Sequence, residues 1–421
     1  MAFQDIRKSR KWLSAEEIRI IVLFLVLLAA LLALNLYLAR VLPAGEWLLL
    51  RWSGARAFLF EQVEPYSRAV AERVQQVVYE RIAFANEYRY VLNDPFYILL
   101  LYTPLAALPK FEIARGIWML VAETALVFTV VFSVRLSEWE PPRGLYLLLI
   151  VFGLFNFFSL NALITASPAI FLAFLYLGAL LALRSFSDEL AGALLFLAAY
   201  QWEVGALFFV FILIFIISNR RWRVLIGLGM SLIVMLIISY LTHSGWGLPY
   251  IRAVISNLYQ GANLNLDHII QNWFPNERIS IAGVVSILLA AVVFIESVNA
   301  VQAHFRRVFW AACLALAVMP LLGLAIFPSN YVVLLPSVIL VLAMIWDRWA
   351  RFRALRITVI LLPFLVVPFV LYLETVYVYT PLYTDLLAIL PLVATIIALY
   401  WMRWWAVRPP RIWADQFIFR R

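Results

Sequence analysis

The sequence predicts an all-α, polytopic membrane protein, and three observations lead to this fold class. The 421 residues are 65% hydrophobic and 14% charged, with a mean hydropathy of +0.94. Ordinary soluble domains are about half apolar and about a quarter charged, so a soluble globular fold is excluded. The apolar residues form runs of the length that a helix needs to cross about 30 Å of hydrocarbon. The alternating segments of about ten residues that are typical of membrane β-barrels do not occur.

The runs bounded by charges or prolines define ten clear spans. We expect them at 18–39, 113–134, 144–160, 163–183, 224–241, 281–299, 308–327, 330–346, 357–378 and 382–402. Two further segments allow two solutions. Either 95–108 crosses and 190–218 crosses once, or 95–108 is re-entrant and 190–218 turns back at Gln201-Trp202-Glu203. Both give a bundle of about twelve transmembrane helices, and we expect the first because it exposes no polar turn to lipid.

Basic residues indicate the orientation of the chain. Four of them, between Arg7 and Lys11, precede the first span, and Ser14 with Glu17 forms a capping box at its start. The positive-inside bias keeps such an N-terminus in the cytoplasm, and the basic clusters of the C-terminal half fall on the same side. We therefore expect a multi-pass cell-membrane protein with a cytoplasmic segment 1–17, one transmembrane domain over 18–402 and a cytoplasmic tail 403–421.

Two outer loops, 40–94 and 242–280, are long enough to cover a site. The first contains valines at helical spacing, including Val70 and Val74, and the second contains Ile251 and Ile255. Both patterns predict amphipathic helices lying in the membrane interface. Long loops usually carry function, so an outward-facing site is expected beneath them.

Several classes of chemistry are disfavoured by the sequence. Cys313 is the single cysteine, and His243, His268 and His304 are far apart, so we expect neither a disulfide nor a resident metal. A divalent metal assembled from Glu46 and Asp94 remains an open alternative. The net charge of +9 reflects topology signals, so we expect no nucleic-acid partner. No Walker loop, dinucleotide fingerprint or nucleophile elbow is present.

Two acidic residues in the first outer loop are candidate catalytic groups. Glu46, in Pro43-Ala44-Gly45-Glu46-Trp47, follows the first span, where partial burial would raise a carboxyl pKa toward the range of a general base. The alternative to a catalytic role is an ordinary interfacial acid paired with an arginine such as Arg51. Asp94 precedes Pro95, and the alternative to a catalytic role for it is a cap at a helix start.

Basic groups of the outer loops could clamp a phosphate, because an arginine fork fits phosphate oxygens in a bidentate way. The candidates are Arg51, Arg56, Arg252, Arg278, His243 and His268. Contacts with lipid headgroups are the alternative for each, and membrane lipids are expected partners. Glu123, Glu203 and Glu296 lie inside apolar runs, where carboxylates mark a proton or substrate path or bind a neighbouring helix.

A series of short motifs follows one another along most of the chain. They are Gly45-Glu46-Trp47, Trp52-Ser53-Gly54-Ala55-Arg56-Ala57-Phe58-Leu59, Glu64-Pro65-Tyr66, Asp94-Pro95-Phe96-Tyr97, Tyr102-Thr103-Pro104-Leu105 with Trp118, Ala191-Gly192, Arg220-Arg221-Trp222-Arg223 and Asn330-Tyr331-Val332-Val333-Leu334-Leu335-Pro336. In order and spacing the series resembles the polyprenol-phosphate-dependent glycosyltransferases of the GT-C superfamily, especially glycosyltransferase family 87. That family has a Gly-Asp pair, an Ala-Ala-Arg stretch and a Pro-Tyr in its opening.

The resemblance implies transfer of a hexose, typically mannose, from a polyprenyl-phosphate donor to a hydroxyl of a glycan or glycolipid acceptor at the outer face, with inversion at the anomeric carbon. It places the base at Glu46, the position of the family's aspartate, and makes Tyr66 and Tyr97 substrate-binding candidates beside Asp94. The chain departs from the family at three places. It has glutamate at position 46 where the family has aspartate. It has Thr165-Ala166-Ser167-Pro168-Ala169 where the family has a Gly-Gln-x-Asn turn, and Gln201-Trp202 where the family has a Lys-Pro pair.

Two other functions fit the same sequence. A transporter or flippase of lipid-linked sugars would use Glu123, Glu203 and Glu296 along a pathway and would show internal repeats, of which the sequence has no clear example. A GT-C relative whose activity has lapsed would keep the fold and tolerate the loss of Glu46.

Overall fold

The computed structural model describes residues 15–84, 87–258, 264–275, 280–324, 326–349, 351–378 and 381–408, and these contain helices and no strand. Most of the predicted cytoplasmic segment 1–17 and residues 409–421 of the tail lie outside these ranges, as does Arg278. The all-helical class that the sequence predicts is confirmed for the described chain.

The helices follow one another with short connections. In chain order they are α1 (Ala15–Val41), α2 (Glu46–Arg56), the π-helix η1 (Ala57–Glu61), α3 (Arg68–Tyr79), α4 (Phe96–Leu101), α5 (Thr103–Ala106), α6 (Phe111–Leu136), α7 (Arg143–Phe155), α8 (Phe157–Ile164), α9 (Ala169–Arg184), α10 (Asp188–Ala198), η2 (Ala199–Gln201), α11 (Trp202–Ser218), α12 (Trp222–Thr242), α13 (Gly247–Leu258), α14 (Leu266–Trp273), α15 (Ile281–Ala300), α16 (Phe305–Val318), η3 (Met319–Leu321), η4 (Pro328–Leu334), α17 (Leu335–Arg348), α18 (Arg353–Val378), α19 (Pro381–Trp401) and α20 (Arg403–Val407).

Apolar helices of membrane-spanning length make this chain a multi-pass membrane protein. By length and composition, eight helical stretches of the described chain qualify, or nine if α7 and α8, bent by 47° at Asn156, form one span. The Asn156 side chain causes this break, because its Oδ1 accepts from the Ser159 N–H at 3.1 Å and begins a new helix. The sequence predicts a boundary between two spans at 160–163, whereas in the structure these residues lie within α8 and the chain breaks at Asn156. The expected number of twelve spans is not confirmed.

The segment 188–218 folds back on itself, contrary to the solution that we favoured from the sequence. Its residues are helical almost without interruption, and a straight helix of this length would separate its ends by roughly 45 Å. Yet Asp188 forms an ion pair with Arg221, just beyond the other end. A Cβ on Gly192 would meet the Val224 carbonyl at 2.1 Å, so α10 packs tightly beside the start of α12. The chain therefore reverses near η2, where Gln201 has a non-helical backbone, so this stretch, one of the eight that qualify by length and composition, is not a single span.

The segment 95–108 forms α4 and α5, of six and four residues, which are too short to cross. Their side chains are largely buried against neighbouring elements, so their polar backbone ends need not face lipid. The expected single crossing of 95–108 is therefore wrong, the reversal within 190–218 agrees with the alternative solution, and a re-entrant position of 95–108 stays a prediction.

The connecting segments gather at two opposite ends of the bundle. At one end Glu138 pairs with Arg306 and, at 3.5 Å, with Arg184. At this end too, Glu296 pairs with Arg403 at 2.9 Å. The solution that we favoured would have put Glu138 and Arg306 on opposite faces, so these pairs contradict it independently.

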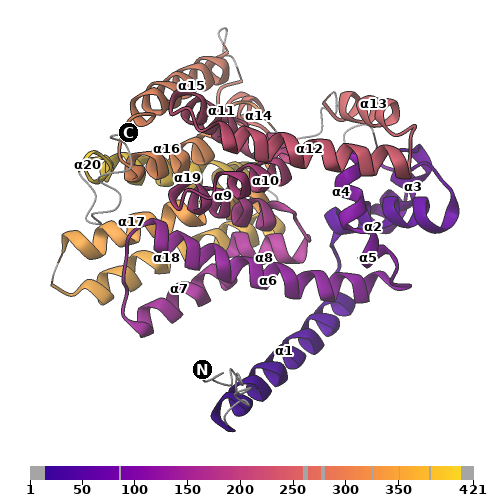
Figure 1. Ribbon diagram of the computed structural model, residues 1–421, viewed down its shortest axis with the longest axis horizontal. Helices are drawn as coiled ribbons and strands as arrows, with labels where there is room; N and C mark the ends of the chain where they lie inside the picture. Colours follow the sequence, from indigo (N-terminus) through magenta and orange to yellow (C-terminus); the bar gives the residue numbers. More distant parts are fainter. Residues whose placement is uncertain are drawn as a thin grey trace, which may run out of the picture.

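The other end is formed by the predicted outer loops. Trp47 and Phe327 have ring centroids 5.2 Å apart, and the Ile326 N–H donates to the Leu264 carbonyl at 2.7 Å. Glu64 meets His243 at 2.9 Å. Figure 1 shows α2 to α5 and α13 grouped on the right, on the opposite side of the bundle from α20. We call this group, residues 42–108 with 243–258, the loop domain.

Helices are present at both predicted places in the loop domain, as α3 and α13, and their position in a membrane interface stays a prediction. Val70 and Val74 of α3 are buried, whereas Val77 is exposed. On α13 both Ile251 and Ile255 are exposed, so the face with these apolar residues points away from the protein. An apolar face that the protein leaves open is what a helix lying in a membrane interface requires.

The core of the bundle lies around α16. Every residue of α16 except Arg307 is buried, and Trp310 donates to the Leu399 carbonyl of α19 at 2.8 Å. In contrast, α1 is exposed along most of its length and projects from the bundle in Figure 1, contacting mainly α6. The exposed apolar side chains of α1 match a lipid environment.

Candidate functional site

Glu46 begins α2, at the end of a turn that the backbone can make only in the left-handed region. Ala44 and Gly45 both have positive φ values, of 96° and 97°. The side chain of Glu46 folds back so that its Oε2 accepts from the Gly45 N–H at 3.0 Å. The turn thus holds the carboxylate at the start of the helix, where the helix dipole favours negative charge.

Arg115 of α6 lies directly beside this turn. A Cβ on Gly45 would come within 2.9 Å of the Arg115 Nε, so only glycine leaves room for the guanidinium. The two terminal nitrogens donate to the Leu42 and Ile164 carbonyls, each at 2.7 Å. Arg115 therefore joins the ends of α1 and α8 to the Glu46 turn. Sequence reasoning missed this residue because it lies inside an apolar run.

Burial raises the pKa of Glu46 above its ordinary value. The hydrogen bonds of the Glu46 and Gly45 backbone and the charge of Arg115 oppose this rise without cancelling it. Glu46 has no ion-pair partner within 4.0 Å in the part of the chain that the structure describes. The direction of this pKa shift agrees with the one expected from partial burial, and the role of Glu46 as a general base stays a prediction.

Aromatic rings lie near Glu46, and we call Trp47, Tyr79, Tyr88 and Tyr90 the aromatic wall. The Trp47 ring lies 5.6 Å from Tyr88 and 6.3 Å from Tyr90, and Tyr79 is 5.8 Å from Tyr90. Burial, followed by the charge of Glu46, raises the pKa of Tyr90, which places that hydroxyl within electrostatic reach of the carboxylate. Aromatic faces beside a polar group suit the stacking of a sugar ring.

Asp94 and Arg51 form a buried ion pair. A terminal nitrogen of Arg51 donates to Oδ1 at 2.9 Å, the Arg51 Nε lies 2.8 Å from Oδ2, and both side chains are at most 3% exposed. Tyr66 donates to the Asp94 carbonyl at 2.9 Å. Both oxygens of this carboxylate lie against Arg51, so Asp94 holds the loop domain together here. The proposed catalytic role of Asp94 remains a prediction.

The other candidate residues lie in separate places. Arg56 donates to the Ala106 and Leu108 carbonyls, each at 3.2 Å, at the end of α5. Tyr97 packs against Phe196, with ring centroids 5.1 Å apart, and burial raises its pKa to about 12. His243 meets Glu64, and His268 lies near Asp385 of α19. The structure thus does not gather these groups around Glu46.

Glu203 is a second carboxylate near this site. It lies at the tip of the hairpin formed by α10 and α11, and after burial its charge is the largest cause that raises the pKa of Tyr88. Glu203 has no ion pair within the described ranges. We did not expect it here because a single crossing would have placed it at the middle of a span. The polar triplet Gln201-Trp202-Glu203 was the available signal.

Two cavities adjoin the loop domain. One, of about 350 Å³, is apolar and is lined by residues of α4, α6, α9 and α10, with Tyr102 and Tyr200 contributing its hydroxyl groups. The other, of about 570 Å³, lies between α3 and α13 and is lined by Tyr66 and Arg252 among others. Glu46 lines neither of these two cavities. Among the described residues no cluster of three or more potential metal ligands occurs.

No protein-family model, curated protein or solved structure matches the chain. The geometry of the site therefore carries the functional argument.

Proposed function

We propose that the protein is a membrane glycosyltransferase of the GT-C type, which transfers a hexose from a polyprenyl-phosphate donor to an acceptor hydroxyl. The observation that carries the proposal is the Glu46 carboxylate, which is half-buried, has a raised pKa and lies near the aromatic wall. Acid residues with raised pKa values cluster at functional sites, and aromatic rings favour carbohydrate.

In the proposed reaction Glu46 accepts the proton of the acceptor hydroxyl. The acceptor oxygen attacks the anomeric carbon of the sugar, the bond from that carbon to the phosphate oxygen breaks, and the polyprenyl phosphate leaves with the electron pair. One displacement inverts the anomeric configuration. Because the leaving phosphate is already an anion, the catalytic demand falls on the base and on nearby positive charge.

The apolar cavity supports a lipid donor. It lies at the surface of spanning helices, with Leu101 and Val121 exposed at its edge. A saturated or prenyl chain could enter from the membrane without passing through water, and Tyr102 and Tyr200 would face its polar end. Arg51 lies 5.8 Å from the Tyr102 ring, with its charge balanced by Asp94.

We place the loop domain on the outer face and both termini in the cytoplasm. The basic clusters of the C-terminal half lie at the end of the bundle away from the loop domain, among them Arg306 and Arg403. The positive-inside bias assigns such an end to the cytoplasm. A lipid-phosphate sugar is then the natural donor, because no nucleotide is needed outside the cell.

The test is transfer from a radiolabelled polyprenyl-phosphate mannose by the full-length protein in lipid nanodiscs. We expect turnover in the wild type and a loss of at least about a hundredfold in Glu46→Gln, the size of a general-base contribution. The matched control is Glu189→Gln, because the side chain of Glu189 is 61% exposed at the opposite end of the bundle. Equal turnover in wild type and Glu46→Gln would refute the role of Glu46. Absence of transfer in the wild type, with polyprenyl-phosphate glucose as well, would favour the lapsed relative.

The carboxylates that a transporter would use do not share one pathway. Glu123 accepts from the Asn35 amide at 2.9 Å between α1 and α6, whereas Glu296 is paired with Arg403 at the other end of the bundle. Glu203 lies at the hairpin tip, beside the loop domain. We therefore keep the transferase as the proposed function.

A further inference from the structure

We propose that the cavity between α3 and α13 binds the acceptor, and that the acceptor is anionic: a sugar that carries a phosphate or carboxylate group. That the bound sugar is the acceptor of the transfer rests on the proposed function. The binding of an anionic sugar to the cavity does not depend on it. The cavity lies in the loop domain, outside the helices that qualify as membrane spans.

The charge of the lining favours an anion. Three arginines, Arg68, Arg89 and Arg252, face the cavity, and Glu72 is the one acidic residue of its lining. Glu72 is already paired with Arg68 at 2.6 Å. Arg252 has no hydrogen-bond or ion-pair partner in the described chain, so its guanidinium is available to a ligand. An arginine fork of this kind matches the oxygens of a phosphate or carboxylate.

The remaining polar groups of the lining suit hydroxyls. The Ser67 Oγ is buried and lacks a hydrogen-bond partner within the described residues, and the Ser256 side chain also faces the cavity. A buried hydroxyl that is left unpaired costs free energy, which a ligand hydroxyl would recover. The volume of about 570 Å³ is in the range of small-molecule sites and accommodates a disaccharide.

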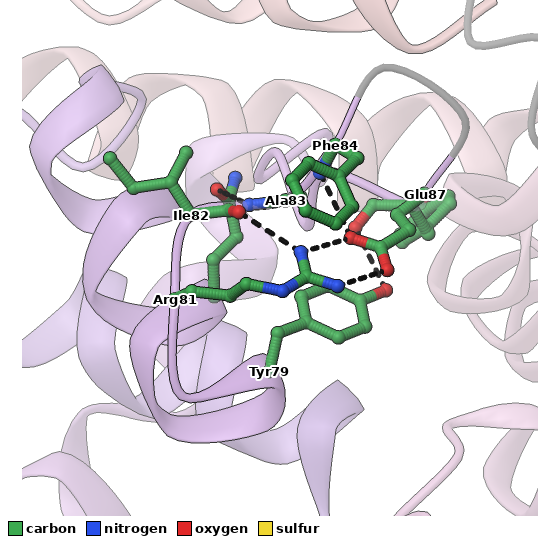
Figure 2. Close-up of polar contacts among 8 residues, drawn as sticks. Tyr79, Arg81, Ile82, Ala83, Phe84 and Glu87 are labelled. Carbon is green, nitrogen blue, oxygen red and sulfur yellow. Dashed lines mark hydrogen bonds and ion pairs between the residues drawn. The ribbon is translucent and has the colours of Figure 1, made fainter.

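The wall of the cavity is fixed before any ligand binds. Gln75 is buried and uses both ends of its amide: its Nε2 donates to the Arg89 carbonyl at 2.6 Å, and its Oε1 accepts from the Ala83 N–H at 3.0 Å. A second set of contacts holds the segment after α3. Figure 2 shows the Arg81 guanidinium lying against the Phe84 ring and pairing with Glu87. Both Arg81 bonds to Glu87 are 2.7 Å long.

This clasp, Arg81 with Phe84 and Glu87, holds the segment that carries Ile82 and Ala83 into the lining. On the same segment, Tyr79 and Tyr90 belong to the aromatic wall of Glu46. The wall of the cavity and the wall of the Glu46 site are therefore built on one piece of chain.

The experiment measures binding of trehalose 6-phosphate and of trehalose to full-length protein in phosphatidylcholine nanodiscs by titration calorimetry. We expect saturable binding of the phosphorylated sugar, weakened by salt, and at least about tenfold weaker binding of trehalose. Arg252→Gln should lower the affinity for trehalose 6-phosphate about tenfold. The matched control, Arg73→Gln, removes the same charge from α3, where Arg73 pairs with Glu61 and does not line the cavity.

The outcomes separate this inference from the proposed function. Equal affinity for the two sugars, or equal weakening in Arg252→Gln and Arg73→Gln, would overturn the anionic site. Binding that persists in Glu46→Gln while wild type shows no transfer would support the cavity and reject the transferase. A second arm uses nanodiscs that contain phosphatidylglycerol. If this lipid displaces trehalose 6-phosphate through Arg252, the anion comes from a lipid headgroup, and if it does not, the anion belongs to a soluble or glycan-borne sugar.

Discussion

Removing the charge of Asp94 should destabilise the loop domain more than any other single polar change that we consider. In Asp94→Asn, Arg51 would stay buried with its guanidinium facing an amide that cannot balance the charge. Both side chains of the pair are at most 3% exposed, so water cannot replace the lost carboxylate. Breaking a buried ion pair by removing one partner costs about 3–5 kcal/mol. We expect an apparent melting temperature at least about 5 °C below that of the wild type.

The measurement is thermal unfolding of purified protein in one detergent, followed by tryptophan fluorescence. Replacing both partners, in Arg51→Met with Asp94→Leu, should recover most of the loss because no buried charge remains unpaired. The control is Glu61→Gln, which breaks the exposed pair with Arg73 and should cost about 0–1 kcal/mol. An Asp94→Asn protein that melts with the wild type would refute this reasoning. A double variant that is stable but inactive would assign Asp94 a role in the reaction.

Three further predictions follow from the geometry. Since the pKa of Glu46 is raised and the base must be deprotonated, transfer should fall as the pH decreases through a value above the ordinary 4.5; a pH–rate profile with its acid limb at or below 4.5 would contradict this. Gly45→Ala adds a Cβ at a φ of 97°, within 2.9 Å of Arg115, so it should lower the free energy of unfolding by about 1–3 kcal/mol and reduce transfer. The control is Gly144→Ala, which has open space around its Cβ and should leave stability and transfer unchanged, as unfolding and transfer assays of the two variants would show. Cysteines placed at Asp188 and Arg221, in a Cys313→Ser background, should be joined by a short bis-maleimide within one chain, as mass spectrometry would show; a straight helix over 188–218 would keep them unjoined.

The sequence was sufficient for the fold class and for most spanning helices. The run predicted at 113–134 is α6, Phe111–Leu136, and the run predicted at 224–241 is α12, Trp222–Thr242. Such runs are recognisable because a lipid-facing helix must be apolar along its whole length. The helices α3 and α13 of the loops were also recognisable, because amphipathic spacing is a local property.

The reversal within 188–218 could not be predicted from local apolarity. A buried hairpin and a single span are both apolar, and the difference lies in contacts between distant residues, such as Gly192 with Val224. The absence of a side chain on Gly192 permits this close approach, but the sequence does not say which partner uses it. A single crossing avoids a polar turn in lipid, which is why the sequence favours it. In the structure the turn at Gln201-Trp202-Glu203 avoids lipid in another way, because it lies beside Tyr88 and the loop domain.

The candidate site was predictable only where it is local. Glu46 stood out by its position after a span, and its turn with Gly45 is formed by adjacent residues. Arg51 pairs with Asp94, which lies 43 positions further along the chain, and not with Glu46. Arg115 reaches carbonyls 73 and 49 positions away, a relation that spacing along the chain does not reveal.

The placement of Arg115 has a consequence for how reactive Glu46 can be. Its guanidinium donates to carbonyls at the C-terminal ends of α1 and α8. Each helix end carries about half a negative elementary charge, so together the two ends neutralise about one positive charge. Arg115 thereby packs beside the turn while exerting only a weak residual pull on the neighbouring acid. Glu46 keeps its basicity because the charge of the adjacent cation is already compensated by the backbone.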